Sequence, residues 1–118
     1  SIPRDTVLPI PYADGKYVKI VSWFVNGLRP LLRKDPRAIA NLVERERPDV
    51  LCLLETRLQE MMVPDFREML PGYTDHWSCS RVRKGYAGTA VFIRDETLAR
   101  AARPSLEQLW GEHKRVMT

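Results

Sequence analysis

Two apolar segments separated by one helix-length stretch constrain the fold of this chain more than any other feature. Tyr17 to Val25 has apolar residues on both faces of a predicted strand, and Asp49 to Glu55 contains a short, fully apolar run. Between them, Asp35-Pro36 is typical of a helix start, and Pro48 ends the predicted helix after about Arg47. Strand, helix and strand at this spacing predict a strand–helix–strand unit within an α/β layer.

The chain that follows predicts two more strands and a short helix. The strands are expected at about Thr74 to Ser80 and Ala87 to Arg94, and the short helix at Pro64 to Leu70. A basic loop that contains glycine, Arg81 to Gly85, lies between the two strands. Residues 17–94 therefore predict one mixed sheet with helices on one face.

The two ends of the chain differ from this central domain. Prolines at positions 3, 9 and 11 exclude a continuous helix or a central strand, so residues 1–16 predict an extended arm. Residues 95–118 are predicted to be a separate tail, in which Ser105 and Gln108 match the capping box of a helix start. One face of that predicted helix carries the residues expected to dock on a protein partner: Leu106, Leu109, Trp110, His113 and Met117.

Composition places the chain among single-domain globular proteins. Its 118 residues are 44% hydrophobic and 29% charged, which excludes a disordered tail, a collagen-like repeat and a disulfide scaffold. The longest apolar run near the middle has five residues, whereas a membrane-spanning helix needs about 20. The net charge of +4 permits a nucleic-acid partner or an anionic surface without requiring either.

The cysteines and the first residue carry information about the cellular compartment in which the protein resides. Cys52 and Cys79 lie in apolar surroundings without CxxC spacing, which predicts buried free thiols in a reducing compartment. The chain begins at Ser1 rather than Met and contains no signal-peptide core. Either a targeting peptide has been removed, which favours an organelle (mitochondrion or plastid, with the nucleus as the alternative), or the sequence records only part of the protein.

Four segments between Tyr17 and Arg94 are informative when they are taken together. They are Lys19–Arg29 (KIVSWFVNGLR), Arg47–Arg57 (RPDVLCLLETR), Pro71–Tyr73 (PGY) and Lys84–Val91 (KGYAGTAV). In this order they resemble the motifs of the exonuclease III-like AP endonucleases, whose first two segments usually read SWNVNGLR and PDVLCLQETK. The resemblance implies a four-layer α/β sandwich, of which this chain would be the N-terminal half.

The resemblance also implies roles for individual residues. Glu55 would be a metal ligand and Asn26 a nearby polar support, with Mg²⁺ as the ion if the ancestral site survives. DNA phosphates would be contacted by arginine, tyrosine and glycine backbone groups at Arg29, Arg57, Tyr86, Gly85 and Gly88.

Two residues depart from the family pattern at the metal site. Phe24 stands in place of the asparagine and Leu54 in place of the glutamine, and neither side chain offers an oxygen. Beside them, Glu55 is costly to keep charged unless a partner pairs with it. In the family, a GD-x-N motif supplies the water-activating aspartate and a Ser-Asp-His lies near the end of the chain. This chain contains no Gly-Asp pair and no Ser-Asp-His. We therefore predict a pseudoenzyme with no catalytic residue and no resident cofactor.

Half of a sandwich would leave one face of its sheet open. We expect that face to bear residues such as Val21, Leu53 and Val91, and to be covered by the C-terminal helix, another copy or a larger complex. The favoured interpretation is a catalytically inactive structural subunit of a larger, possibly organellar, assembly, with protein subunits on the open face. The alternatives are a DNA-repair AP endonuclease or exonuclease, as a fragment or a split Mg-dependent enzyme, and a non-catalytic nucleic-acid-binding module.

Overall fold

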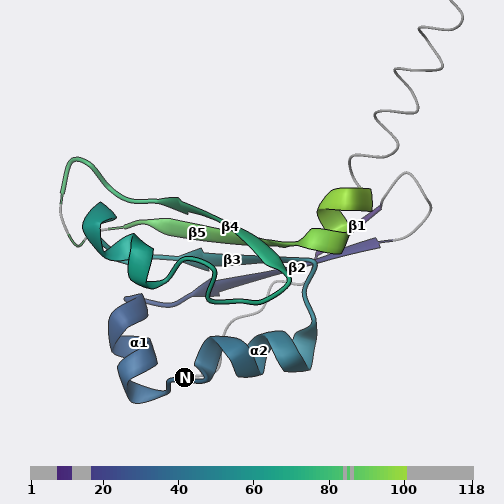
Figure 1. Ribbon diagram of the computed structural model, residues 1–118, viewed down its shortest axis with the longest axis horizontal. Helices are drawn as coiled ribbons and strands as arrows, with labels where there is room; N and C mark the ends of the chain where they lie inside the picture. The colour runs from purple at the N-terminus through teal and green to yellow at the C-terminus, as the bar shows by residue number, and fades with distance from the viewer. Residues whose placement is uncertain (1–7, 12–16, 84, 86, 101–118) are drawn as a thin grey trace, which may run out of the picture.

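The computed structural model describes residues 8–11, 17–83, 85 and 87–100 (Figure 1). Its helices and strands are, in chain order, β1 (Leu8–Pro11), β2 (Tyr17–Phe24), α1 (Leu28–Lys34), α2 (Ala38–Glu46), β3 (Val50–Leu54), the 3₁₀ helix η1 (Glu60–Asp65), β4 (Tyr73–Ser78) and β5 (Thr89–Arg94). Residues 95–100 are helical as well.

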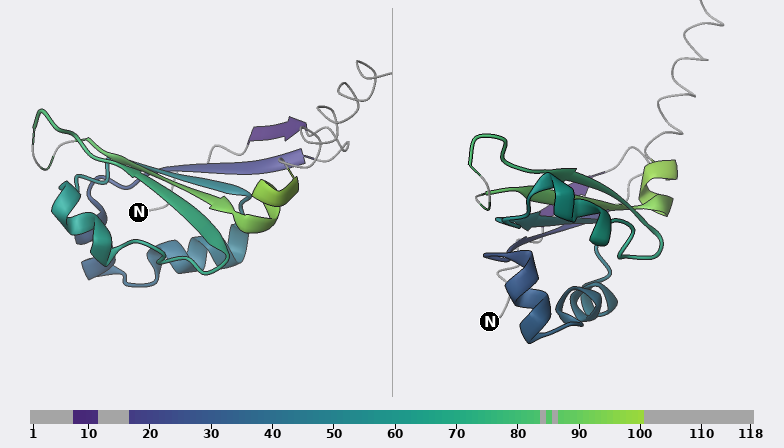
Figure 2. Two further views of the ribbon diagram at one scale, coloured as in Figure 1. Left: turned by 45° about the horizontal axis from the view of Figure 1, so that its top comes forward. Right: turned by 60° about the vertical axis from the view of Figure 1, so that its left-hand side comes forward.

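The five strands form one sheet in the order β1-β2-β3-β5-β4. β2 and β3 run parallel, with Val21 opposite Leu51, and every other neighbouring pair is antiparallel. Both views of Figure 2 place α1 and α2 on the same side of this sheet. The predicted α/β fold, a mixed sheet with helices on one face, is therefore confirmed.

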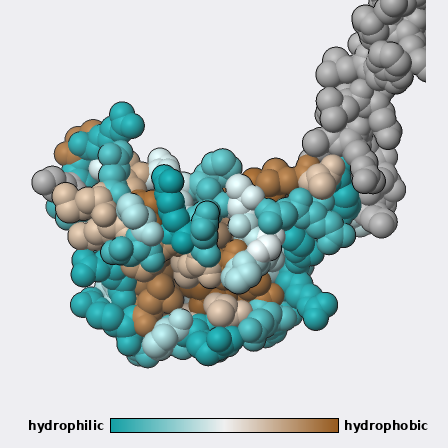
Figure 3. Space-filling model, in the orientation of Figure 1, coloured by the Kyte–Doolittle hydropathy of each residue, from teal (hydrophilic) through white to brown (hydrophobic). Residues whose placement is uncertain are grey.

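The core lies between the sheet and the helices. Figure 3 shows apolar side chains in that layer, with hydrophilic residues around them. The fully or nearly fully buried positions come from every layer: Val21, Trp23, Leu28, Ile39, Leu42, Leu51, Leu53 and Phe92. The expectation that Val21 and Leu53 face outward is thus wrong, because the pleat turns both residues towards the helices. Val91, on the alternate positions of β5, does lie on the opposite face.

α2 confirms the helix that the sequence predicted from Asp35 to Arg47, although it begins three residues later, whereas α1, which precedes that range, was not predicted. Asp35 ends α1 through its backbone N–H, which donates to the Leu31 carbonyl at 2.8 Å. Its carboxylate then accepts the backbone N–H of Arg37 at 3.2 Å, just before α2. Asp35 therefore links two helices instead of starting one. Pro30 lies in the first turn of α1. The N–H groups of a first turn have no partner within the helix, so the N–H that proline lacks costs no helical hydrogen bond.

Other boundaries also differ from the sequence-based expectation. η1 covers Glu60–Asp65 as a 3₁₀ helix, so the helix predicted at Pro64 to Leu70 is wrong. Within the predicted arm, β1 pairs with β2 at the edge of the sheet, a place that tolerates prolines. The helical turn at residues 95–100 was not predicted. The docking residues from Leu106 to Met117 lie outside the described residues, and no described helix is long and apolar enough to cross a membrane.

Both cysteines are free but only half-buried, which corrects the expectation of fully buried thiols. Burial raises the pKa of the Cys52 thiol, although a hydrogen bond with Ser22 acts against that shift. Burial and the nearby charge of Glu60 raise the pKa of the Cys79 thiol. Both thiols are therefore less readily ionised than an ordinary cysteine.

Asp49 joins the start of β3 to the neighbouring elements. Its carboxylate accepts hydrogen bonds from the Lys19 backbone N–H at 2.7 Å and the Thr97 hydroxyl at 2.9 Å. Nη1 of Arg94 lies 3.4 Å from the same carboxylate. This buried carboxylate therefore connects β2, β3, β5 and the turn at residues 95–100 at one end of the sheet.

Candidate functional site

Three loops meet at the other end of the sheet. The first loop, residues 25–27, follows β2, and the second loop, residues 55–59, follows β3. The third loop lies between β4 and β5 and ends at residues 87–88. Backbone hydrogen bonds join the first loop to the second: the N–H of Gly27 donates to the Glu55 carbonyl at 2.8 Å, and that of Leu28 to the Thr56 carbonyl at 2.9 Å. The second loop is joined to the third by Thr56 N–H to Gly88 carbonyl at 3.0 Å and Arg57 N–H to Ala87 carbonyl at 2.7 Å. These main-chain hydrogen bonds therefore fix the positions of the three loops independently of their side chains.

The backbone of these loops is conformationally unusual. Non-glycine residues with positive φ occur in all three loops, at Asn26 (53°), Glu55 (58°), Arg57 (58°) and Ala87 (53°). Such conformations are uncommon for residues with a side chain and cost free energy. They persist here because the hydrogen-bonded neighbours determine the path of the chain. Strain of this kind is concentrated at functional sites, which makes this end of the sheet the candidate site.

Glu55, the sequence-predicted metal ligand, is partly exposed and carries a positively charged neighbour. Its Oε2 lies 3.6 Å from Nε of Arg57. Asn26, the predicted polar support, is exposed at the end of β2. Within the described part of the chain, no group of three His, Cys, Asp or Glu residues could hold a metal ion.

Phe24 and Leu54 lie side by side as register partners at the ends of the parallel strands β2 and β3. Phe24 is 57% exposed and Leu54 is 38% exposed, and Leu54 directly precedes Glu55. Mg²⁺ prefers oxygen ligands and retains several waters, so it needs polar neighbours around its carboxylate. One carboxylate paired with an arginine and flanked by two apolar side chains does not fit that requirement.

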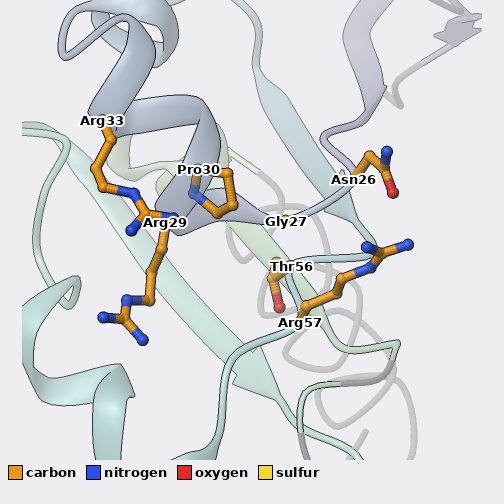
Figure 4. A pocket seen from close by; sticks show the side chains of 7 residues that line it. All are labelled: Asn26, Gly27, Arg29, Pro30, Arg33, Thr56 and Arg57. Atoms are coloured by element: carbon orange, nitrogen blue, oxygen red, sulfur yellow. The ribbon is translucent and has the colours of Figure 1, made fainter.

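A pocket of about 230 Å³ opens next to these loops. It is lined by Asn26, Gly27, Arg29, Pro30, Arg33, Thr56 and Arg57. Figure 4 shows Arg29 and Arg33 projecting from α1 on one side of Thr56 and Arg57 on the other side. The structure thus brings together three residues that the sequence predicted at the site: Asn26, Arg29 and Arg57. Gly88, which was also predicted, does not line the pocket but lies against Thr56. Tyr86 lies outside the described residues.

The pocket is positively charged. Arg29 donates a hydrogen bond to the sulfur of Met62 at 3.6 Å, and no ion pair joins Arg29 or Arg33 to a carboxylate among the residues that the structure describes. The hydroxyl of Thr56 is buried and has no hydrogen-bond partner there. Guanidinium groups without acidic partners favour an anionic ligand, and phosphate suits them best because it accepts two parallel hydrogen bonds.

Sequence reasoning missed two polar side chains that line the pocket, Arg33 and Thr56. Arg33 lies one helical turn after Arg29, and an i, i+4 pair of arginines becomes visible once a helix is allowed to start at Leu28. Thr56 has no such signal, because its importance comes from its contact with a glycine 32 positions away.

The comparison with known families decides which family this chain belongs to. The profile of the Endonuclease/Exonuclease/phosphatase family matches residues 22–117. The chain belongs to this family. The match extends past Arg94, where the recognisable motifs end.

Individual family members agree with this assignment. The chain is 41% identical over 83 residues to Recombination repair protein 1 of Drosophila melanogaster, covering 70% of this chain and 12% of that protein. It is 39% identical over 82 residues to the exodeoxyribonuclease of Bacillus subtilis, covering 69% of this chain and 30% of that protein. The crystal structure of the AP endonuclease LMAP from Leishmania major superposes with a TM-score of 0.65 at 30% identity, covering 77% of this chain and 30% of that one. The resemblance to AP endonucleases is confirmed, and this chain spans less than a third of each of these relatives.

Proposed function

We propose that this chain binds the phosphate backbone of DNA as the N-terminal part of an AP-endonuclease-like domain, and that its own residues do not cut DNA. The observation that carries this proposal is the pocket with Arg29 and Arg33, which have no carboxylate partner in the described part of the chain. The names of the relatives, a recombination repair protein and an exodeoxyribonuclease, support DNA as the polymer.

The arrangement of the pocket suits a polyanion. Arg29 and Arg33 lie on the same side of α1, and Arg57, which pairs with Glu55, lines the pocket from the second loop. Contacts of this kind position a nucleic acid without reading its bases, because each nucleotide presents the same phosphate. The ligand expected here is therefore a duplex or single strand of any sequence.

The absence of cleavage follows from the side chains around Glu55. Phe24 and Leu54 expose apolar surface where the family motifs have asparagine and glutamine, whose side chains offer oxygen, and Arg57 pairs with the carboxylate that remains. A metal ion at this position would lack both polar neighbours and the charge that attracts it. No step of phosphodiester hydrolysis is therefore assigned to this chain.

DNA binding is tested with a fluorescein-labelled 20-base-pair duplex, with and without an abasic site, by anisotropy. We expect a dissociation constant of about 10⁻⁴–10⁻⁶ M near physiological salt, which rises steeply as salt increases. Arg29→Ala and Arg33→Ala should each weaken binding several-fold and lower the magnitude of the log–log salt slope by about 0.9 per lost phosphate contact.

Arg45→Ala is the matched control, since Arg45 is an exposed arginine of α2 that pairs with Glu46, away from the pocket. It should leave both the affinity and the salt slope close to those of the unmodified chain. Binding that both pocket variants leave unchanged, or no binding at low salt, would refute the proposal. Cleavage of the abasic duplex by this chain alone in Mg²⁺ would refute its non-catalytic part.

A second candidate function is supported by the exposed apolar pair Phe24 and Leu54. We propose it as a structural role, in which this chain is a non-catalytic subunit of a larger assembly and protein subunits cover the open face of its sheet. The test is the native mass of the endogenous protein after gentle extraction of separated organelles and nuclei, with mass spectrometry of whatever migrates with it. A large, defined complex supports the structural role, and a free species of this chain contradicts it.

A further inference from the structure

Arg29 and Arg33 line a second hollow in addition to the pocket at the loop end. This hollow, which we call the Phe66 hollow, has a volume of about 260 Å³, and its other lining residues are Leu32 of α1 and Phe66 at the end of η1. Because the two cavities share both arginines, they adjoin each other. They differ in chemistry: polar side chains surround the arginines in the first, whereas an aliphatic and an aromatic side chain accompany them in the second.

The ring of Phe66 is held in place by its surroundings. Its backbone N–H donates to the Val63 carbonyl at 2.8 Å, where η1 ends. The centroid of its ring lies 6.3 Å from that of Trp77, whose ring in turn meets the buried ring of Phe92 edge-on at 5.6 Å. Phe66 itself is only half-buried, so part of its ring faces the hollow. An aromatic ring that is already fixed by packing loses little conformational entropy when a ligand contacts it.

Arg29 connects α1 to the element that carries Phe66. Its Nη1 donates to the sulfur of Met62 in η1 at 3.6 Å. A thioether is a weak acceptor, and a phosphate oxygen is a much stronger one, so the guanidinium has donors available for a phosphate. Figure 4 shows Arg29 and Arg33 extending from the same side of α1. Both side chains can therefore contact a phosphate with their guanidinium groups while their aliphatic stems line the Phe66 hollow.

An anion site that adjoins an apolar hollow selects an amphipathic ligand. A free phosphate ion would leave Leu32 and Phe66 without a contact, and a purely apolar molecule would leave the guanidinium groups without an acceptor. A nucleotide carries both parts in one unit, because its phosphate is anionic and its flat base stacks on aromatic rings. In a duplex the base is paired and stacked between its neighbours, so only an unpaired nucleotide offers its base to Phe66.

We infer that the Phe66 hollow receives the unpaired base of a DNA strand whose phosphate is bound by Arg29 and Arg33. This inference rests on the proposed function and deepens it, because it names the form of DNA that the site prefers. The phosphate contacts supply affinity for any strand, and the aromatic ring adds affinity only where a base is free. The preferred ligand is therefore a single strand, a gap or an overhang of any sequence, rather than a fully paired duplex.

The experiment compares three fluorescein-labelled ligands of equal length by anisotropy. They are oligo(dT), a strand of abasic tetrahydrofuran units that has the same phosphates but no bases, and a duplex. We expect oligo(dT) to bind about tenfold more tightly than the abasic strand. Phe66→Leu should remove that difference by weakening oligo(dT) alone, and it should leave the salt slope unchanged because the slope counts phosphate contacts. Arg29→Ala should weaken the binding of both strands.

Two further variants separate stacking from a general effect on folding. Phe66→Tyr keeps an aromatic ring and should retain the affinity for oligo(dT). Tyr17→Leu is the matched control, because Tyr17 is a 64% exposed aromatic residue at the start of β2, at the end of the sheet away from the loops. It should change neither affinity. Circular dichroism checks that every variant is folded.

A second measurement uses the unmodified chain. Oligo(dT) that carries one 5-iododeoxyuridine is bound and irradiated, and mass spectrometry of the digested protein should locate the cross-link at Phe66. The inference is overturned, while the DNA-binding proposal stands, if oligo(dT) and the abasic strand bind alike and Arg29→Ala weakens both. It is equally overturned if folded Phe66→Leu weakens both strands to the same extent, or if the cross-link forms only outside the Phe66 hollow. If neither strand binds at low salt, the proposed function fails and the inference fails with it.

Discussion

The backbone of Gly88 lies so close to Thr56 that a Cβ atom at position 88 would approach the Thr56 hydroxyl oxygen to 2.7 Å. Gly88 also has a φ of 91°, a conformation that residues with a side chain rarely adopt. The contact joins the second and third loops at the candidate site, where Thr56 N–H already donates to the Gly88 carbonyl. Glycine is therefore required at this position for two independent reasons.

Gly88→Ala should destabilise the chain by about 2–4 kcal/mol, because it adds a steric clash to the cost of a strained φ. Gly85→Ala in the same loop is the control: Gly85 has a φ of 68°, but a Cβ there would meet nothing within 4 Å. We expect that variant to lose only about 1 kcal/mol. Urea unfolding measures both, and equal losses would contradict the proposed role of the Thr56 contact.

Asp49→Ala should be strongly destabilising, by about 2–4 kcal/mol, since it leaves the Lys19 N–H and the Thr97 hydroxyl without their acceptor and Arg94 without its counter-charge. Glu44→Ala, which removes an exposed partner of Arg37, should change stability by less than about 0.5 kcal/mol. The two variants are compared by the urea concentration at the midpoint of unfolding, with the slope of the unfolding free energy against urea taken as the same for both. A small effect at Asp49 would show that this network does not hold the sheet together.

Asp75 predicts a pH dependence of stability. Burial raises the pKa of its carboxyl group, but the Trp77 indole N–H at 2.6 Å and the Glu68 backbone N–H at 3.1 Å lower it more, so that the pKa lies below the ordinary value of 3.8. A carboxyl group whose pKa is lowered by folding stabilises the protein above its unfolded pKa. That contribution is lost as the pH falls below 3.8 and through the folded pKa.

Asp75→Asn keeps an acceptor for the Trp77 indole but removes the charge. Its stability should therefore fall less than that of the unmodified chain when the pH is lowered from neutral to about 2.5. Thermal unfolding at a series of pH values, followed by Trp fluorescence, measures the difference. Parallel curves for the two proteins would show that Asp75 does not contribute in this way.

The strands could be predicted because alternation and turn residues are local features. β2, β3, β4 and β5 lie within one or two residues of the segments expected from the sequence. Which face each residue occupies was harder to predict. The run from Val50 to Leu54 is apolar throughout, so its pattern does not distinguish the helix side from the open face. Packing against α1 and α2 determines which of these residues face the helices.

The candidate site was predicted only where its residues lie within family motifs. Arg29 and Arg57 could be named from the sequence, but Arg33 could not, because the strong turn at Asn26-Gly27 concealed a helix that begins at Leu28. The contact between Thr56 and Gly88 depends on how two loops meet in space. The pairing of Glu55 with Arg57, both of which have a positive φ, likewise depends on a loop conformation that the sequence pattern does not indicate.

The last prediction concerns whether the polar site can be restored. Phe24→Asn combined with Leu54→Gln returns both family residues beside Glu55, but Arg57 still pairs with that carboxylate, and no group of three His, Cys, Asp or Glu residues in the described part of the chain could hold a metal ion. We therefore expect no Mg²⁺-dependent cleavage of an abasic duplex by the double variant, with the exodeoxyribonuclease of Bacillus subtilis as the positive control. Unchanged circular dichroism would confirm that the variant is folded. Cleavage by the double variant alone would mean that two side chains separate this chain from an active nuclease, and the non-catalytic proposal would then have to be abandoned.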